Sequence, residues 1–180
     1  WKMHKTVAES LELAEGLVEE TNGTTSEVLI FPPFTALETV ADAIDGKHIH
    51  YGAQDLHWED QGAFTGAVSG SQIADIGCEY VLVGHSERRH IFGEKEKLIA
   101  QKLIAAYRNG LKPMLCVGEN LAERENGMTA RVIGMQLKSA LKVLTPEQAE
   151  VLSVAYEPVW AIGTGKAATP ADAQKVCYFI

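Results

Sequence analysis

Residues 80–84 read YVLVG, a short apolar run that ends in a glycine and is followed by His85. The run does not alternate between apolar and polar residues, which is typical of a strand buried on both faces of a parallel sheet. Runs of the same kind occur at four other places: EVLIF (27–31), HIHYGAQ (48–54), KPMLCVG (112–118) and VLSVAYE (151–157). The sequence therefore predicts five strands, most of them buried.

Segments with helical periodicity separate these runs, at 6–20, 94–110 and 130–144. A further helix is expected to begin at Thr169-Pro170, because threonine suits the N-cap and proline the first helical turn. Helices that alternate with strands predict an α/β fold with a parallel sheet.

Two architectures fit this alternation. A (β/α)8 barrel needs about 200 to 250 residues. The 180 residues of the chain would then form a single incomplete barrel domain, 1–180, with about five to six of the eight βα units. An open doubly wound sheet is the alternative, although its usual GxGxxG turn is absent. The chain lacks an initial Met and stops within a helical pattern, so we expect the first strand and the C-terminal part to be missing.

The composition argues against several classes of function. The formal net charge is -8, and an acidic chain without a basic stripe argues against nucleic-acid binding. No apolar run approaches the roughly 18 residues of a membrane span, so no membrane association is expected. Cys78, Cys116 and Cys177 are widely spaced and form no CxxC pair. This spacing favours reduced thiols in a cytoplasmic protein.

Three chemically active side chains lie next to predicted strand ends. His85 follows the run at 80–84, Glu157 ends the run at 151–157, and Lys2 lies where a missing first strand would end. The C-terminal ends of barrel strands share one face, and that face carries the chemistry. A cation, an imidazole and a carboxylate that converge there can transfer protons. Each residue alone also has an ordinary explanation: a solvated lysine, a loop-bonding histidine and a capping glutamate.

The segment AYEPVWAIGTGKAATP (155–170) separates Glu157 from the next helix by a proline, a tryptophan and two glycines. Pro158 restricts the backbone at one end of this loop, whereas Gly163 and Gly165 permit close approach to a ligand. The pattern predicts a loop that closes over the carboxylate.

With these residues in place, the chain resembles a known family, triosephosphate isomerase. WKM, FPPF, GAQ, HWEDQGAFTG, YVLVGHSERR, CVGE, YEPVWAIGTGKAATP and ADAQ occur in the family's order and extend over the whole chain. GHSERR and YEPVWAIGTGK are highly specific. The resemblance implies a TIM barrel. It also implies an isomerase of glycolysis and gluconeogenesis that interconverts D-glyceraldehyde 3-phosphate and dihydroxyacetone phosphate through an enediolate.

The resemblance also assigns roles to residues. Glu157 resembles the base, His85 the electrophile, and Lys2 a lysine that binds the substrate and holds its negative charge. The family is itself a known example of pKa tuning, with a neutral histidine as electrophile and a closing loop that excludes water. The lid of the family is matched by Pro158, Val159, Trp160, Ala161, Ile162, Gly163, Thr164, Gly165 and Lys166.

Further roles are implied less directly. They are substrate binding by Ile162 and Gly163, support of the site by Ser86 and Glu87, and entry into a partner subunit by Phe64, Thr65 and Gly66. Ala67 stands where the family commonly has an acidic residue, which predicts a weaker ion pair across a homodimer. The family's chemistry implies a small phosphorylated triose as substrate, with no metal and no cofactor.

Three other functions could be inferred from parts of the sequence. His48 and His50 have the His-x-His spacing of a metal-dependent hydrolase, but they begin their strand and no further ligand set follows. The GTGK of 163–166 fails as a P-loop, because Trp160 and Ala167 occupy positions that need glycine and serine or threonine. The last rival is a non-catalytic scaffold that retains the sequence motifs of the family.

Overall fold

The computed structural model describes residues 1–180, and their contacts form two compact units. The first unit comprises Trp1–Val83 with Ala105–Pro113, and the second comprises Gly84–Ile104 with Met114–Ile180. The strands are β1 (Val28–Ile30), β2 (Ile49–Ala53), β3 (Tyr80–Val83), β4 (Lys112–Val117) and β5 (Ser153–Tyr156). The α-helices are α1 (Val7–Glu20), α2 (Leu37–Ile44), α3 (Gly70–Asp75), α4 (Ser86–His90), α5 (Glu96–Arg108), α6 (Leu121–Glu125), α7 (Thr129–Leu141), α8 (Pro146–Glu150) and α9 (Pro170–Phe179). Two 3-10 turns complete the elements, η1 (Phe34–Ala36) and η2 (Val159–Ala161).

The five predicted strands are confirmed, each one to three residues shorter than its apolar run. The helix after Thr169 is confirmed as well, with Thr169 as N-cap and Pro170 in the first turn. The short helices α6 and α8 were not predicted. Each begins with a capping box, formed by Asn120 with Glu123 and by Thr145 with Gln148.

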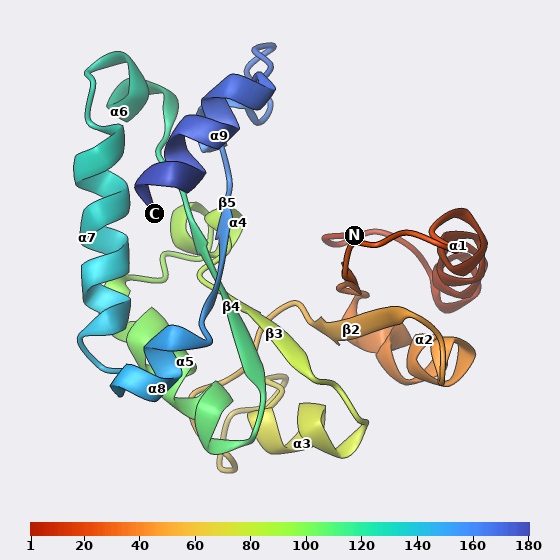
Figure 1. Ribbon diagram of the computed structural model, residues 1–180. Helices are drawn as coiled ribbons and strands as arrows, with labels where there is room; N and C mark the ends of the chain where they lie inside the picture. Colours follow the sequence, from red (N-terminus) through yellow and green to blue (C-terminus); the bar gives the residue numbers. More distant parts are fainter. The chain divides into compact units, whose positions relative to one another are not determined.

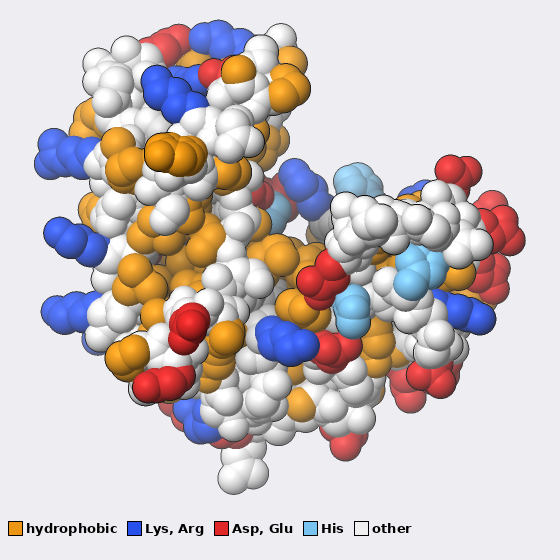
Figure 2. All heavy atoms as spheres, in the orientation of Figure 1, with side chains coloured by type: hydrophobic (Ala, Val, Ile, Leu, Met, Phe, Trp, Pro, Cys, Tyr) orange, Lys and Arg blue, Asp and Glu red, His pale blue; other side chains and the backbone are white.

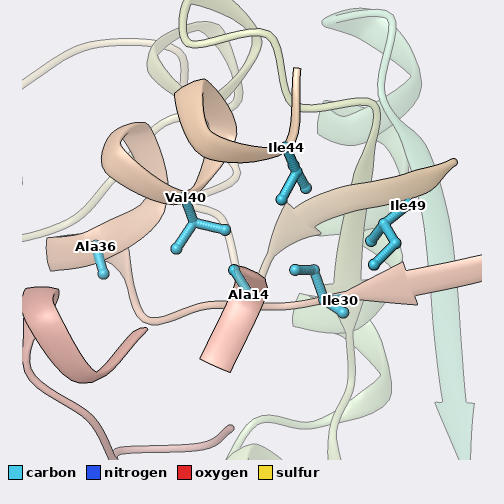
Figure 3. Packing of buried hydrophobic residues seen from close by; sticks show 6 residues of the cluster. All are labelled: Ala14, Ile30, Ala36, Val40, Ile44 and Ile49. Atoms are coloured by element: carbon cyan, nitrogen blue, oxygen red, sulfur yellow. The ribbon is translucent and has the colours of Figure 1, made fainter. Parts of the chain in front are cut away.

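The first unit contains three parallel strands in the order β1-β2-β3, of which β2 and β3 are labelled in Figure 1. Val28 pairs with Ile49, and Gly52 pairs with Tyr80. Side chains from α1, η1, α2, β1 and β2 meet in one apolar cluster (Figure 3): Ala14, Ile30, Ala36, Val40, Ile44 and Ile49. The helices of this unit are therefore fixed on the sheet by the burial of their apolar stripes.

The second unit is built on β4 and β5, which run parallel and lie side by side (Figure 1). Their register pairs Met114 with Ser153 and ends with Val117 opposite Tyr156. The next residue on each strand therefore brings Gly118 and Glu157 together. Unlike the buried strands expected, β5 is half-buried throughout. It is an edge strand of the described sheet, paired with β4 alone.

Charged side chains are distributed unevenly over the helices. Figure 2 shows acidic side chains along α1 and basic side chains along the outer edge of α7, where Arg131, Lys138 and Lys142 are exposed. The opposite side of α7 is buried and carries Val132, Ile133, Gln136 and Ala140. No helix is long and apolar enough to cross a bilayer.

Candidate active site

His85 sits directly after β3 and Gly84 and caps α4. Its Nδ1 accepts a hydrogen bond from the backbone N–H of Glu87 at 3.3 Å. An imidazole nitrogen that accepts a hydrogen bond carries a lone pair, so the ring proton of a neutral His85 lies on Nε2. His85 can therefore donate a hydrogen bond from Nε2 without being positively charged.

Glu157 follows β5 and receives that hydrogen bond. His85 Nε2 lies 2.9 Å from Glu157 Oε1, and both side chains are only 17% exposed. Ser86 holds the same carboxylate twice: its backbone N–H donates to Oε2 at 2.8 Å and its hydroxyl to Oε1 at 3.2 Å. The strand end thus presents a carboxylate whose oxygens are oriented by donors from the start of α4.

The pKa of Glu157 results from opposing effects. Burial raises it, but the hydrogen bond and charge of His85 and the donors of Ser86 together bring the pKa below its usual value. Glu157 in turn acts on the buried thiol of Cys116 on β4. Burial, and then the charge of Glu157, raise the pKa of Cys116, so this thiol stays protonated. Glu157 is therefore ionised at neutral pH, as a base must be.

Arg89 fixes the loop that carries His85. Its buried guanidinium donates to the carbonyl oxygens of Gly84 at 2.6 Å and Cys116 at 3.0 Å, and to Glu96 at 2.5 Å. Gly84 has a φ of +74°, which favours glycine. Arg89 lies within the GHSERR motif, but no role was predicted for it. A buried arginine needs several acceptors, and the charge of this residue four positions after His85 was the available signal.

The predicted lid begins with a rigid hinge. Trp160 is 7% exposed, and its indole Nε1 donates to the Tyr156 hydroxyl at 3.2 Å. That hydroxyl lies 3.2 Å from both carboxylate oxygens of Glu119, which is fully buried. The backbone N–H of Trp160 also donates to the carbonyl of Glu119 at 3.1 Å. The network anchors η2 to the loop after β4; neither Glu119 nor Tyr156 was predicted.

Helix α6 contacts both ends of the lid. Arg124 donates to Glu119 at 3.2 Å and to Asp172 of the α9 capping box at 2.5 Å. Its guanidinium also lies 4.4 Å from the ring centroid of Trp160. Beyond the glycines, Lys166 pairs with Glu125 at 2.9 Å. Gly163 and Gly165 have φ values of +69° and +76°, so the tip of the lid uses a backbone that glycine adopts readily.

The remaining predicted residues lie as follows. Glu87 lies in the first turn of α4, with its carboxylate 3.8 Å from His85 Nδ1. Lys2 belongs to the first unit, where its carbonyl accepts a hydrogen bond from Gln54 at 2.9 Å, and its φ is +51°. A non-glycine residue with positive φ is uncommon and marks a locally constrained backbone.

The predicted dimer loop is held from its base. Asp60 accepts hydrogen bonds from Arg108 at 2.8 and 2.9 Å and from Asn109 at 2.7 Å. Nearer the tip, the ring of Phe64 lies 4.1 Å from that of His57, and Phe64 remains 43% exposed. The loop therefore has a fixed shape and presents an aromatic side chain to solvent.

The metal-site interpretation of His48 and His50 is wrong. His48 bonds to Thr21 at 2.8 Å and His50 to Glu79 at 2.9 Å. No group of three or more His, Cys, Asp or Glu side chains could hold a metal ion.

Comparison with known proteins gives a uniform result. A family model described as triosephosphate isomerase matches residues 1–180. The triosephosphate isomerase of Moorella thermoacetica is 54% identical over 180 residues, covering 100% of this chain and 72% of the relative. The proteins of the same name from Carboxydothermus hydrogenoformans and Roseiflexus castenholzii are 51% and 53% identical, over 100% and 97% of this chain and 72% and 69% of their own lengths. The chain therefore spans about 70% of the length of these relatives.

Proposed function

The chain belongs to the triosephosphate isomerase family, and we propose that it carries out the family's reaction with Glu157 as base, His85 as electrophile and Lys2 as the cationic group. The reaction interconverts D-glyceraldehyde 3-phosphate and dihydroxyacetone phosphate, an aldose–ketose isomerisation. The fold is that family's (β/α)8 barrel, of which the chain contains five parallel strands and their helices. We propose that these residues belong to one incomplete barrel domain.

The observation that carries this assignment is the pair formed by His85 and Glu157. Glu157 is ionised and oriented, and His85 has a proton on Nε2 directed at the carboxylate. The C–H next to a carbonyl is too weakly acidic for a carboxylate unless the resulting enediolate is stabilised. A donor beside the base supplies that stabilisation, because it can bond to the oxygen on which charge develops.

The proton transfers follow from this arrangement. The substrate carbonyl oxygen takes the Nε2 hydrogen bond that Glu157 accepts in the structure, and the released carboxylate abstracts the adjacent carbon-bound proton. Glu157 then returns the proton to the neighbouring carbon. His85 polarises the two oxygens of the enediolate or moves a proton between them. Both steps are proton transfers, so the mechanism uses no metal and no cofactor.

Lys2 and the lid act on the charges of the substrate. Lys2 supplies a cation for the phosphate and the developing oxyanion. The lid, Pro158–Lys166, closes over the substrate, and the N–H of Gly163 and the neighbouring Ile162 bind the phosphate. Closure excludes water, which strengthens each charge interaction in the site. Glu87 and Ser86 support the site, Ser86 through its two bonds to Glu157.

The proposal extends to the assembly and setting of the enzyme. Phe64, Thr65 and Gly66 enter a second copy of the chain to form a homodimer. The fixed shape of the loop and the exposure of Phe64 support this. The enzyme acts in glycolysis and gluconeogenesis in the cytoplasm, an environment that suits three free cysteines. We propose no nucleic-acid or membrane partner.

Isomerase turnover of the full-length protein, beside Glu157→Gln and a control Glu147→Gln, tests the assignment. Glu147 lies on α8, so its variant controls for the loss of one carboxylate away from the site. We expect Glu157→Gln to lower kcat at least about 10²- to 10⁴-fold, the usual contribution of a general base, and Glu147→Gln to match the parent. A folded Glu157→Gln variant with parental turnover would remove Glu157 from the role of base. An inactive, folded parent would favour the scaffold interpretation.

A further inference from the structure

Gln136 is a buried amide on α7 with an unusual set of partners. It is 6% exposed, although it lies in a helix whose other buried residues are apolar. Its Oε1 accepts from the backbone N–H of Gly118 at 3.0 Å, and its Nε2 donates to the carbonyl of Gly118 at 3.2 Å. One side chain thus satisfies both backbone groups of the residue that follows β4.

Gly118 is in turn packed against the backbone of Glu157. A Cβ at this position would lie 1.9 Å from the carbonyl oxygen of Glu157 and 3.3 Å from the Val159 side chain. Val117, the residue before Gly118, bonds directly to Glu157: its carbonyl accepts a hydrogen bond from the N–H of Glu157 at 2.8 Å. The backbone of Glu157 therefore rests on the peptide that Gln136 holds.

We propose that Gln136 is a positioning residue for Glu157, acting through the backbone of Gly118. The proposal rests on the role of Glu157 as base in the proposed function. The chain of contacts runs from the amide of α7 to Gly118, from Gly118 to the Glu157 backbone, and from there to a carboxylate bonded to His85 and Ser86. The side-chain hydrogen bonds of Gln136 both go to the backbone of Gly118 rather than to the carboxylate itself.

A glutamine is the residue type that this position requires. The Gly118 peptide groups present one donor and one acceptor, and an amide offers the matching acceptor and donor on one planar group. An ionised glutamate lacks the donor, and a methionine of similar size lacks both. If Gly118 were released, the end of β5 would gain freedom. Displacements of about 1 Å in a catalytic group can cost about 10²-fold in rate.

The rival explanation is that Gln136 only stabilises the packing of α7. A buried pair of hydrogen bonds stabilises the fold, and its loss would lower Tm whatever the role of the residue. Ile133, fully buried on the same helix, supplies the control. Ile133→Val removes one methylene group from the core, which lowers Tm, and keeps the side chain that bonds to Gly118.

The experiment compares the full-length parent with Gln136→Met, Gln136→Glu and Ile133→Val. We expect both Gln136 variants to lower kcat by about 10- to 100-fold, with KM changed less than threefold. We also expect the acid limb of kcat/KM to move to higher pH. The shift arises because a loosened Glu157 loses part of its bonding to His85 and Ser86, which raises its pKa toward the usual value. Ile133→Val should lower Tm alone and keep the parental kcat and pH profile.

Two outcomes overturn the proposal: parental kcat and acid limb in a folded Gln136 variant, or a kcat loss reproduced by Ile133→Val. If Gln136→Met does not fold, the isosteric Gln136→Glu decides the question by the same criteria. Glu157→Gln, assayed in parallel, separates the two levels of proposal. If that variant is inactive while the Gln136 variants match the parent, only the positioning role fails. If it retains activity, the assignment of the base fails first.

Discussion

At the scale of single residues, the most informative feature is that the two ring nitrogens of His85 have different partners. The backbone N–H of Glu87 at Nδ1 leaves the ring proton on Nε2, where it faces Glu157. The hydrogen bond at Nδ1 thus fixes the tautomer of a neutral ring. Backbone geometry around one histidine therefore orients a ring N–H donor toward the carboxylate of Glu157.

The pKa of Glu157 leads to a first prediction. Ser86→Ala removes the hydroxyl donor at 3.2 Å but keeps the backbone N–H. We expect the pKa of Glu157 to rise toward its ordinary value, so the acid limb of kcat/KM should move to higher pH than in the parent. Profiles of parent and variant with the same substrate are compared, because the titration of the substrate phosphate is common to both. Coincident acid limbs would contradict this role of the hydroxyl.

The lowered pKa of Glu157 also makes the stability of the fold depend on pH. The folded pKa of Glu157 lies below the unfolded one, so its bonding stabilises the fold above the unfolded pKa. This contribution is lost as the pH falls through the folded pKa. In Ser86→Ala the contribution should be smaller and its loss should be complete at a higher pH, because the folded pKa lies closer to the unfolded one. Thermal unfolding of both proteins from pH 7 to pH 3 measures the difference.

Gly118 and Gly134 form a matched pair of glycines for a second prediction. An added Cβ at Gly118 would lie 1.9 Å from the Glu157 carbonyl oxygen, whereas at Gly134 on α7 it would meet only a Phe179 ring atom at 3.9 Å. Gly118→Ala should cost at least about 1–3 kcal/mol of stability through overpacking and displace the base, lowering kcat. Gly134→Ala should raise stability by about 0.5–1 kcal/mol, because alanine is the better helix former. Denaturant unfolding and turnover of both variants check this; equal effects would contradict the close approach at Gly118.

At the scale of elements, α6 anchors the lid from both ends. A single residue, Arg124, bonds to the loop after β4 and to the cap of α9, and stacks on the tryptophan of the hinge. The proposed lid is therefore held near both ends by side chains of α6, a helix of only five residues.

Arg124→Lys tests this anchoring. Lysine keeps the charge but loses the planar fork that reaches two carboxylates and the flat surface over Trp160. Because Glu119 is fully buried and loses a partner, we expect a loss of about 1–3 kcal/mol and a change in the rate of lid motion. Thermal unfolding at fixed protein concentration and the fluorescence relaxation of Trp160 on ligand binding measure the two effects. Arg131→Lys, on the exposed edge of α7, is the control. If both variants match the parent, α6 does not anchor the lid.

Elements with strong local signals were predictable, and those that depend on a few polar atoms were not. The strands showed as apolar runs, and α9 showed through Thr169 and Pro170. Helices α6 and α8 contain no buried residues, so no apolar stripe marked them. Their capping boxes were present in the sequence but are weaker signals than hydrophobic periodicity.

At the scale of the whole molecule, the sequence predicted the strand-end positions of His85 and Glu157 but not the buried side chains that support them. The order of strands and helices placed His85 and Glu157 at strand ends, and the pairing of β4 with β5 follows from the parallel sheet. The buried supports, Arg89, Glu119 and Gln136, bond to partners that lie 27, 37 and 18 residues away in the sequence. Such contacts depend on tertiary packing, so local pattern could not assign partners to these residues.

Assembly gives the final prediction, which concerns the proposed homodimer. Asp60 fixes the base of the loop through Arg108 and Asn109, and these bonds lower the pKa of its carboxyl. Asp60→Asn weakens this support while leaving the tip, with Phe64, unchanged. A loop that must be ordered on association binds less tightly, so we expect the dimer dissociation constant to rise about three- to tenfold.

Sedimentation velocity over a range of protein concentrations measures that constant. Asp75→Asn, at the exposed end of α3, removes the same charge from the same unit and serves as the control. An equal rise in both variants would assign the effect to net charge. An unchanged dimer dissociation constant in Asp60→Asn would mean that dimer formation does not depend on the hydrogen bonds of Asp60. Phe64→Ala tests the contact itself: if the loop enters the partner, removal of this ring should weaken the dimer more than Asp60→Asn does. The reason is that a buried aromatic anchor commonly contributes more than about 2 kcal/mol to an interface.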